Sequence, residues 1–333
     1  MKRCRHAVSD SAESLLRWWD SAKRPLPWRT TDDPWAILLS EVVLQQTQVV
    51  RGLVHWMLLI EAFPTPEAMA AATEDEVLQL WQGAGYYARA RRLHSLTQTL
   101  DGSPLPTTSS ELQQLPGIGP YTAAAVASIA HGEPIASVDG NFRRIISRIH
   151  EWSEPSSKQI QSAADTLLDQ TRPGDWNQAM MDLGAMVCTP RNPDCGACPL
   201  SSHCRGKTSP HSFPKPKKRR LVDEHGIALL IQSGDRFFLE RRPPGLLGGL
   251  WCPPIRFETP SCDAILTEFN LNNHVIHQIG EVTHVFSHRR WHLDVYFLSL
   301  SSPFPHPSGR WDIPSKTSAT RLTERLISLL PTT

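Results

Sequence analysis

The sequence has no run of about 18 apolar residues, so we expect no membrane-spanning helix. Its N-terminal segment, MKRCRHAVSDSAESLL, lacks the apolar centre of a signal peptide and carries acidic residues early, so we expect no signal peptide. Net charge is also nearly absent, with a formal value of +1 at pH 7. Any attraction to polyanions must therefore come from local basic patches rather than from the chain as a whole.

A disulfide framework is not expected, because the seven cysteines are odd in number and unevenly spread. Cys4, Cys252 and Cys262 are scattered, whereas the remaining four cluster with the spacing C-x6-C-x2-C-x5-C. This distribution suits a reducing compartment and a metal site better than it suits disulfide pairs. The clustered residues, and our candidate metal ligands, are Cys188, Cys195, Cys198 and Cys204.

The spacing within this cluster indicates which metal group it binds. Tetrahedral zinc usually takes its thiolates from two close pairs, and here only Cys195 and Cys198 form one. A 4Fe-4S cluster fits the pattern better, with zinc as the alternative. We expect the cluster to hold the fold together, while Arg191, Arg205 and Lys207 beside it could contact DNA.

The length of 333 residues and a hydrophobic content of 40% predict about two domains with packed cores. From about residue 10 to 205, segments such as PWAILLSEVVLQQ and TAAAVASIA repeat apolar residues every three to four positions, which predicts helices. We assign residues 1–205 to an all-helical domain. Residues 206–222 are rich in Pro, Lys and Arg, which is typical of a linker; the basic residues from Lys215 to Arg220 could also form a nuclear signal.

The pattern changes after residue 222. GIALLI and RFFLE, separated by a turn at Ser233–Asp235, predict a β-hairpin. EVTHVFSH and HLDVYFLSL alternate with a period of two and predict further strands, and SATRLTERLISLL predicts a closing helix. We therefore expect residues 223–333 to form an α+β domain.

The segment SSELQQLPGIGPYTAAAVASIA predicts a helix, a tight hairpin and a second helix. Ser109 or Ser110 could cap the first helix. Gly117 and Gly119 permit a tight backbone and leave N–H groups uncovered beside a helix N-terminus, an arrangement that favours a phosphate oxygen. An ordinary helix–helix turn would explain the same residues.

Two acids stand out in apolar surroundings. Glu41 in WAILLSEVVL would share a helix face with apolar residues; burial there would raise its pKa, as a general acid requires. Asp139 in ASVDGNFRRII precedes a helix and could be its N-cap. Two carboxyl groups with opposite protonation states suit the cleavage of a glycosidic bond. Alternatively, Glu41 faces solvent or pairs with an arginine.

Taken together, SEVVLQQTQV, GAGYYARARRLH, LPGIGPYTA, VDGNFRR, NQAMMDLGAMVC and the cysteine spacing resemble the MutY-type adenine DNA glycosylases over nearly the whole chain. The resemblance implies a multidomain protein: an all-α helix-hairpin-helix glycosylase with a 4Fe-4S loop, followed by an α+β Nudix-like domain. It also implies excision of adenine paired with 8-oxoguanine or guanine in double-stranded DNA, by a monomer in the cytoplasm at the nucleoid.

The resemblance assigns a catalytic role to four residues. Glu41 matches the acid that protonates adenine at N7 and later assists a water molecule, and Asp139 matches the carboxylate that stabilises the sugar cation. Asn141 matches a residue that positions the reacting nucleotide. Tyr121 stands where lyase-competent relatives carry a lysine, and a phenol cannot form a Schiff base, so a monofunctional enzyme is implied.

The resemblance also implies a set of DNA contacts. Arg29 matches part of the adenine pocket, and Gln46 and Tyr86 match residues that enter the duplex near the lesion. Ser287 and His288, in the second domain, match the contact to the oxidised guanine; without the family match they would be a plain exposed strand pair.

The sequence departs from the family pattern at three positions. Ala84 stands where leucine is common, Pro120 where a basic residue is frequent, and Cys252 where an acid is usual. These departures concern the efficiency of the reaction and the grip on the lesion, because none of them replaces a catalytic carboxylate.

Three other functions are compatible with parts of the sequence. An endonuclease III-type glycosylase/lyase is disfavoured by Tyr121 and by the second domain. A non-catalytic iron–sulfur DNA-binding protein is disfavoured because it would give Glu41 and Asp139 no role. A Nudix hydrolase with a helical extension is disfavoured because Glu258, Asp263 and Glu268 are too sparse for the acidic run of that family.

Overall fold

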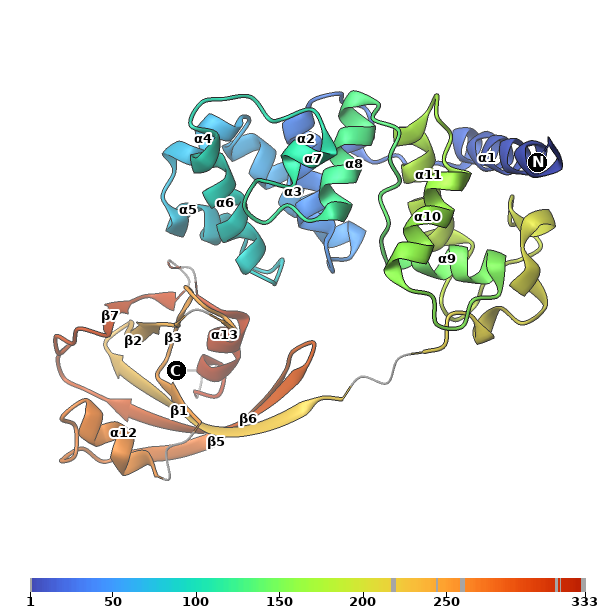
Figure 1. Cartoon of the computed structure of the whole chain (residues 1–333). Helices are drawn as coiled ribbons and strands as arrows, with labels where there is room; N and C mark the ends of the chain where they lie inside the picture. Colours follow the sequence, from blue (N-terminus) through green and yellow to red (C-terminus); the bar gives the residue numbers. More distant parts are fainter. Residues whose placement is uncertain are drawn as a thin grey trace. The chain divides into compact units, whose positions relative to one another are not determined.

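The computed structural model describes residues 2–216, 220–243, 245–257, 261–314, 317 and 319–330. Contacts between Cα atoms divide the chain into two units, each with segments distant in sequence. The first consists of Met1–Ala71 and Arg92–Lys217, and the second of Ala72–Arg91 and Lys218–Thr333. Figure 1 labels most of the helices and strands of both units.

The described part of the first unit is helical and contains no strand, as the apolar periodicity predicts. One helix, α6 (Ala88–Leu100), begins in the other unit and continues into this one. The other α-helices are α1 (Lys2–Ala22), α2 (Pro34–Leu44), α3 (Val49–Ala62), α4 (Pro66–Ala71), α7 (Ser109–Leu112), α8 (Pro120–His131), α9 (Gly140–His150), α10 (Ser157–Leu167) and α11 (Pro173–Met186). The 3-10 turns are η1 (Pro27–Arg29), η2 (Ser201–His203), η3 (Arg205–Thr208) and η4 (Pro210–Ser212).

Helices α2 and α9, which both carry residues of the candidate site, each begin at an aspartate that accepts backbone N–H groups. Asp33 accepts from the first turn of α2. Asp139 accepts from Phe142 N at the start of α9, which confirms the predicted cap. The prediction for α7 was wrong by one or two residues, because Thr108 is its cap. Ser109 is instead the first helical residue, and its backbone N–H and hydroxyl both donate to Glu133.

The helices of the first unit form two groups that α11 connects. In one group α2 packs against α3 and α8, and in the other α1, α9, α10 and α11 pack together, with α11 also in contact with α8 (Figure 1). The second group surrounds a core that includes Leu15, Trp19 and Ile145 and an edge-to-face pair of Phe142 and Trp176, with ring centroids 5.6 Å apart. Residues from both groups can therefore reach the space beside α11.

The beginning of the expected linker is packed against the first unit. Turns η3 and η4 occupy residues 205–212, and η3 contacts α9. Gly206 is buried there, and a Cβ atom on it would lie 2.6 Å from the carbonyl oxygen of Arg148, so this approach requires glycine. Residues 217–219 of the basic run lie outside the described residues.

The second unit contains α5 (Glu74–Leu80) and a mixed β-sheet with the strand order β3-β2-β1-β6-β5. Strand β1 pairs in parallel with β6, whereas the other pairings are antiparallel. The strands are β1 (Val222–Ser233), β2 (Arg236–Arg241), β3 (Trp251–Cys252), β4 (Ile255–Arg256), β5 (His277–Val285), β6 (Arg289–Ser299) and β7 (Gly309–Asp312). Two helices, α12 (Cys262–Glu268) and α13 (Arg321–Ile327), complete it.

Each face of this sheet is buried under one helix. Alternate residues of β1 contribute to opposite cores: Ala228 and Leu230 pack on the α13 side, and Leu229 and Ile231 on the α12 side. The predicted β1–β2 hairpin and the closing helix are confirmed. Within the described residues, no helix has the length and apolar character needed to cross a membrane.

The end of one predicted strand was wrong. Strand β5 stops at Val285, so Ser287 and His288 lie in the short turn before β6 instead of on a strand. A turn frees these two side chains from the alternation that a sheet imposes, and both are available at its tip.

Candidate active site

Glu41 lies in the middle of α2, where every residue from Trp35 to Val43 is buried. Its side chain is 7% exposed, and Oε2 accepts a hydrogen bond of 2.6 Å from the hydroxyl of Tyr121. Burial is the main reason that the pKa of Glu41 rises to about 7, and the negative charge of Asp139 adds to the rise. The Tyr121 hydrogen bond and the charge of Arg29 oppose it. The expectation that this acid is buried with a raised pKa is therefore met. It does not face solvent, and it forms no ion pair with any residue that the structure describes.

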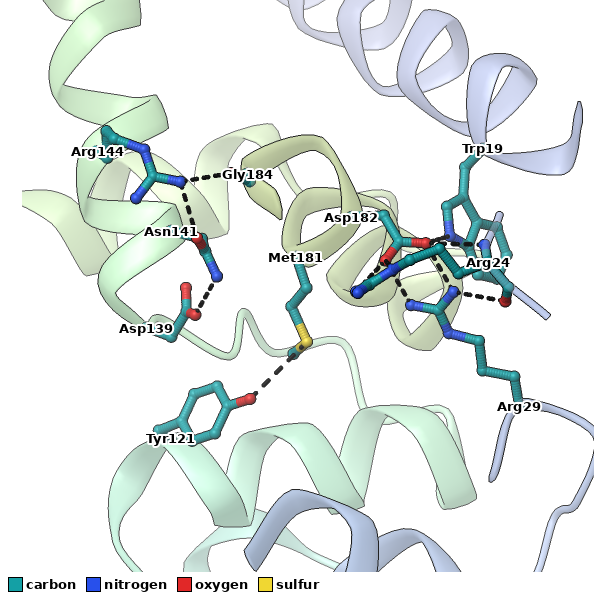
Figure 2. Close-up of polar contacts among 10 residues, drawn as sticks. All are labelled: Trp19, Arg24, Arg29, Tyr121, Asp139, Asn141, Arg144, Met181, Asp182 and Gly184. Carbon is teal, nitrogen blue, oxygen red and sulfur yellow. Dashed lines mark hydrogen bonds and ion pairs between the residues drawn. The ribbon is translucent and has the colours of Figure 1, made fainter. Parts of the chain in front are cut away.

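Tyr121 reaches this acid from α8, which begins at Pro120 after the N-cap Gly119. Its hydroxyl also lies 3.8 Å from the sulfur of Met181 on α11, as Figure 2 shows. Burial raises the pKa of Tyr121 well above its usual value, and the nearby carboxyl groups of Glu41 and Asp139 add to this rise. The phenol therefore stays protonated and serves as a hydrogen-bond donor to the carboxyl group of Glu41.

Asp139 is held in place from two sides. One carboxylate oxygen caps α9 by accepting from Phe142 N at 2.8 Å, and the other accepts from the Asn141 amide at 2.7 Å. Asn141 in turn accepts from Arg144, which also donates to the Gly184 carbonyl (Figure 2). Burial is the largest influence on the pKa of Asp139 and raises it, although these hydrogen bonds oppose the rise. The carboxylate is thus fixed at the edge of the site.

A further buried carboxylate, that of Asp182, directly follows Met181 on α11 and leaves the helix in a different direction (Figure 2). Asp182 is fully buried and accepts bidentate hydrogen bonds from Arg29, at 2.6 and 2.8 Å, as well as bonds from Arg24 and Trp19 (Figure 2). Burial acts to raise its pKa, but the bonds and charges of the two arginines prevail and lower it. Asp182 is therefore ionised and orients Arg29.

Asp182 and Arg24 are not among the site residues predicted from the sequence. A signal existed, because Asp182 in NQAMMDLGAMVC is a lone acid within an apolar helical run, as Glu41 is. Its arginine partners could not be inferred, since they come from more than 150 positions away, at separations of 153 and 158 residues.

Two residues expected to enter DNA share an unusual backbone. Gln46 has φ of 57° and Tyr86 has φ of 50°, which places both in the left-handed region that non-glycine residues rarely adopt. Both side chains are exposed, Tyr86 by 46%. Such conformations persist where surrounding structure imposes them, and they are frequent at functional sites.

The two hairpin glycines differ in what they allow. Gly117 has φ of 81°, and a Cβ atom there would lie 2.6 Å from Cβ of Arg92, so the turn demands glycine. Gly119 has an ordinary φ of −89° and faces open space, with no heavy atom within 4 Å of a Cβ position. Its role is therefore to leave the N-terminus of α8 uncovered rather than to permit a turn.

The four clustered cysteines form the candidate metal centre. They are free thiols that together line a small, enclosed cavity after α11. Burial, followed by the charges of the other three cysteines, raises the pKa of Cys198 to about 11. Among the described residues, no three His, Cys, Asp or Glu side chains are placed to hold a single metal ion, so the shared cavity suits a larger iron–sulfur cluster better than the alternative of one zinc ion. The donor set therefore fits a 4Fe-4S cluster held by these cysteines.

Arg148 of α9 connects the cysteine loop to the helical core. It is 3% exposed and donates to the sulfur of Cys188 at 3.2 Å and to the Thr189 carbonyl at 2.8 Å. It also donates to Pro210 O, in η4. The predicted surface cations near the loop, Arg191, Arg205 and Lys207, are exposed.

In the second unit, Ser287 and His288 lie at the β5–β6 turn and contact each other, with Oγ and Nδ1 3.1 Å apart. Of the acids weighed for a hydrolase site, Glu258 lies outside the described residues, and Glu268 is engaged in an ion pair with Arg256. Because Glu268 is held in this ion pair, its role is structural.

The three residues that depart from the family pattern have different surroundings. Ala84 is 5% exposed, so it lies inside its fold and not at the exposed tip with Tyr86. Pro120 occupies the first turn of α8, where its missing N–H is not needed. Cys252 is fully buried in β3, and burial raises the pKa of its thiol to about 12.

Three protein families match consecutive parts of the chain. Residues 39–170 match the HhH-GPD superfamily of base excision DNA repair proteins, residues 188–204 match the iron-sulfur binding domain of endonuclease III, and residues 226–324 match the NUDIX domain. Among solved structures, a thermostable thymine-DNA glycosylase is similar, with a TM-score of 0.57 and 28% identity over 61% of this chain and 97% of its own. An endonuclease III complex with DNA, at 23% identity and a TM-score of 0.53, shares the fold.

Curated relatives match the chain over most of its length. Adenine DNA glycosylase of Homo sapiens is 35% identical and covers 92% of this chain and 72% of its own. That of Schizosaccharomyces pombe is 32% identical and covers 87% of this chain and 82% of its own. That of Mycolicibacterium smegmatis is 40% identical and covers 66% of this chain and 76% of its own. The helical site, the four-cysteine loop and the NUDIX domain follow one another along the chain, and relatives match nearly all of it. The chain therefore belongs to the adenine DNA glycosylase family.

Proposed function

We propose that this base excision repair glycosylase hydrolyses the N-glycosidic bond of adenine paired with 8-oxoguanine or guanine in duplex DNA. The observation that carries the proposal is the carboxyl group of Glu41, buried among apolar residues and bonded to Tyr121, with a pKa raised to about 7. Such a group holds a proton near neutral pH, as a general acid must.

In this mechanism Glu41 gives its proton to N7 of an extruded adenine. The C1′–N9 bond then breaks, its electron pair leaves with the base, and a cation develops on the sugar. Asp139, fixed by Phe142 N and Asn141, provides the anion that stabilises this cation. The Glu41 carboxylate that results can accept a proton from the attacking water, which regenerates the acid.

Arg29 supports an adenine pocket beside this acid. Both terminal nitrogens of Arg29 donate to the Asp182 carboxylate. Arg24 and Trp19 donate to the same carboxylate and hold it in place. The Nε atom of Arg29 is buried and, among the described residues, has no hydrogen-bond partner. A buried donor without a partner is unfavourable, and a purine ring nitrogen would satisfy it.

Tyr121 supports the assignment to a monofunctional enzyme. Its hydroxyl remains protonated and is bonded to Glu41, and it cannot form the imine through which a lysine breaks the strand. The second function that we consider, a glycosylase/lyase, would need an amine at this position.

DNA is the partner of this family, and several features suit it. The exposed Gln46 and Tyr86 offer a polar group and an aromatic ring for the space that a flipped adenine leaves. The open N-terminus at Gly119 and the turn at Gly117 offer backbone N–H groups to a phosphate. Ser287 and His288 offer hydrogen bonds to 8-oxoguanine.

We further propose a division into a glycosylase domain (1–205), a connector (206–222) and a lesion-recognition domain (223–333). The chain would act as a monomer at the nucleoid in the cytoplasm, where its DNA substrate is found. The 4Fe-4S cluster would stabilise the loop that Arg148 attaches to α9.

A single-turnover assay on duplexes with adenine opposite 8-oxoguanine, guanine or thymine tests the proposal. We expect adenine release from the first two, strand breaks after alkali only, and loss of at least about 100-fold in rate for Glu41→Gln with DNA binding retained. Undiminished release by this variant would remove Glu41 from the mechanism. Strand breaks without alkali would favour the lyase.

A further inference from the structure

Helices α2 and α8 are joined by a side-chain hydrogen bond next to the one that Glu41 accepts from Tyr121. The Nε2 atom of Gln45 donates to the hydroxyl oxygen of Thr122 at 3.1 Å. Gln45 is the C-cap of α2, one helical turn after Glu41. On α8, Thr122 directly follows Tyr121. The two hydrogen bonds are therefore neighbouring links between the same pair of helices, and one of them holds the carboxyl group of Glu41.

Gln45 also begins the turn that carries Gln46, the residue expected to enter the duplex. Residues 45–48 connect α2 to α3. Within this turn the N–H of Thr47 donates to the Leu44 carbonyl at 3.2 Å, and Gln46 has the left-handed φ of 57°. A non-glycine residue keeps this conformation only where surrounding contacts impose it. The position of the exposed Gln46 side chain is therefore set by the contacts of its neighbours on either side.

The other flank of this turn is held by the close packing of α3. A Cβ atom on Gly52 would lie 2.6 Å from Cδ2 of Leu44, so the start of α3 approaches the end of α2 in a way that requires glycine. Gly52 also donates its N–H to the carbonyl of Gln48, at 2.8 Å. Gln46 is thus held between the hydrogen bond to Thr122 on one side and the packing of α3 on the other.

We propose that the Gln45–Thr122 hydrogen bond is a positioning contact, which fixes where Gln46 enters the duplex relative to Glu41. Thr122 is 2% exposed, so water does not replace the bond when it is lost, and the turn is then released from α8. Gln46 would fill the space left by an extruded adenine less well, and less adenine would reach Glu41. The bond between Tyr121 and Glu41 remains. This inference rests on the proposed function, because it concerns how the substrate base is brought to the acid.

The fluorescence of 2-aminopurine tests this contact, because the base is quenched in a stacked duplex and brightens when it is extruded. The full chain is titrated into a duplex with 2-aminopurine opposite 8-oxoguanine, and a 2′-fluorine on this nucleotide resists cleavage by destabilising the sugar cation. We expect the wild-type chain to brighten the probe. Thr122→Val replaces the hydroxyl with a methyl group and should lower the extruded-to-stacked ratio at saturation by about threefold to tenfold, the effect of one neutral hydrogen bond. Thr122→Ser keeps the hydroxyl and should behave as wild type.

Gln45→Leu tests the same bond from its donor side, and it keeps the proposal testable if Thr122→Val does not fold. It should lower the extruded-to-stacked ratio by a similar factor. The double variant should lose no more than either single variant, because both substitutions remove one shared contact.

Thr97→Val is the matched control. Thr97 is also buried, at 1% exposed, but its hydroxyl donates to the His94 carbonyl within α6. It should keep the wild-type ratio, and the Tm of each variant shows whether the fold is kept. Wild-type ratios for folded Thr122→Val and Gln45→Leu, an equal loss for Thr97→Val, or a probe that stays dark with the wild-type chain would overturn the proposal.

The rate of adenine release separates this inference from the proposed function. On a duplex with adenine opposite 8-oxoguanine, Thr122→Val should slow single-turnover release by the factor by which it lowers the extruded-to-stacked ratio. The pH dependence of the rate should stay that of wild type, because Glu41 keeps its hydrogen bond. A changed pH dependence would show that the contact acts on the acid, which would overturn the positioning role. A wild-type chain that brightens the probe but releases no adenine would contradict the proposed function alone.

Discussion

Glu41 shows how burial and hydrogen bonding set the protonation state of a single carboxyl group. Desolvation is the largest influence on its pKa and raises it, whereas the Tyr121 hydrogen bond and the charge of Arg29 reduce the rise. The resulting pKa of about 7 allows the group to give a proton and to accept one afterwards. Asp182, also buried, stays ionised because two arginines contact it directly.

This raised pKa predicts a dependence of stability on pH. The pKa of Glu41 rises from 4.5 to about 7 on folding, so folding favours its protonated form. Its burial is therefore tolerated below the unfolded pKa and becomes most unfavourable above the folded one. Glu41→Gln removes this penalty, and its stability relative to wild type should increase by about 2 kcal/mol between pH 5.5 and 8.5.

Thermal unfolding of both proteins across this range is the measurement, and parallel curves would contradict the assignment. Glu76 offers a comparison of opposite sign, because the hydrogen bonds from the Thr73 backbone and side chain lower its pKa. Glu76→Gln should therefore not gain stability as the pH rises.

The sequence was sufficient to identify residues whose surroundings are local. Glu41 is flanked by its own apolar helix, and Asp139 caps the helix that follows it, so both follow from neighbouring residues. The Arg29–Asp182 pair joins distant helices, and no pattern along the chain indicates it. The pairing of Glu224 on β1 with Trp291 on β6 is similar, since the two strands are distant in sequence and meet only in the folded sheet.

At the scale of an element, the hairpin before α8 contains two glycines with different roles. Gly117 is required by the backbone conformation, whereas Gly119 leaves the N-terminus of α8 uncovered. Gly117→Ala would strain a φ of 81° and bring Cβ against Arg92. We expect a loss of about 1–3 kcal/mol in stability and weaker duplex binding. Gly119→Ala adds a methyl group in open space at ordinary φ, so it should keep the stability within about 0.5 kcal/mol.

Gly119→Ala is therefore the matched control, and it tests the phosphate contact separately. If duplex binding weakens in this variant while its Tm is unchanged, the uncovered N-terminus of α8 contacts DNA. Equal Tm values for Gly117→Ala and wild type would contradict the conformational argument.

Element boundaries were less predictable than element types. The cap of α7 moved to Thr108 because Ser109 is occupied by Glu133, a partner 24 positions away. Strand β5 ended before Ser287 because the chain must reverse to reach β6, and the alternation of apolar residues in EVTHVFSH does not encode that reversal. Both differences arise from contacts that lie beyond a local pattern.

At the scale of the whole molecule, the two units present separate chemistry. The first unit carries the buried acids and the cysteine loop, which suit bond cleavage and DNA backbone contact. The second carries the turn with Ser287 and His288 and a sheet that lacks the acidic run of a hydrolase. Excision and lesion preference should therefore be separable by mutation.

The double variant Ser287→Ala, His288→Ala tests this separation. Both residues lie in the turn after β5 and are exposed, so their removal should leave the fold intact. The loss of their hydrogen bonds should reduce the ratio of excision rates opposite 8-oxoguanine and guanine by about tenfold or more. The rate opposite guanine should change little, because Glu41 and Asp139 are untouched. A ratio equal to that of wild type would place lesion recognition in another part of the chain, whereas an equal fall in both rates would show that the turn supports binding without discriminating between the two bases.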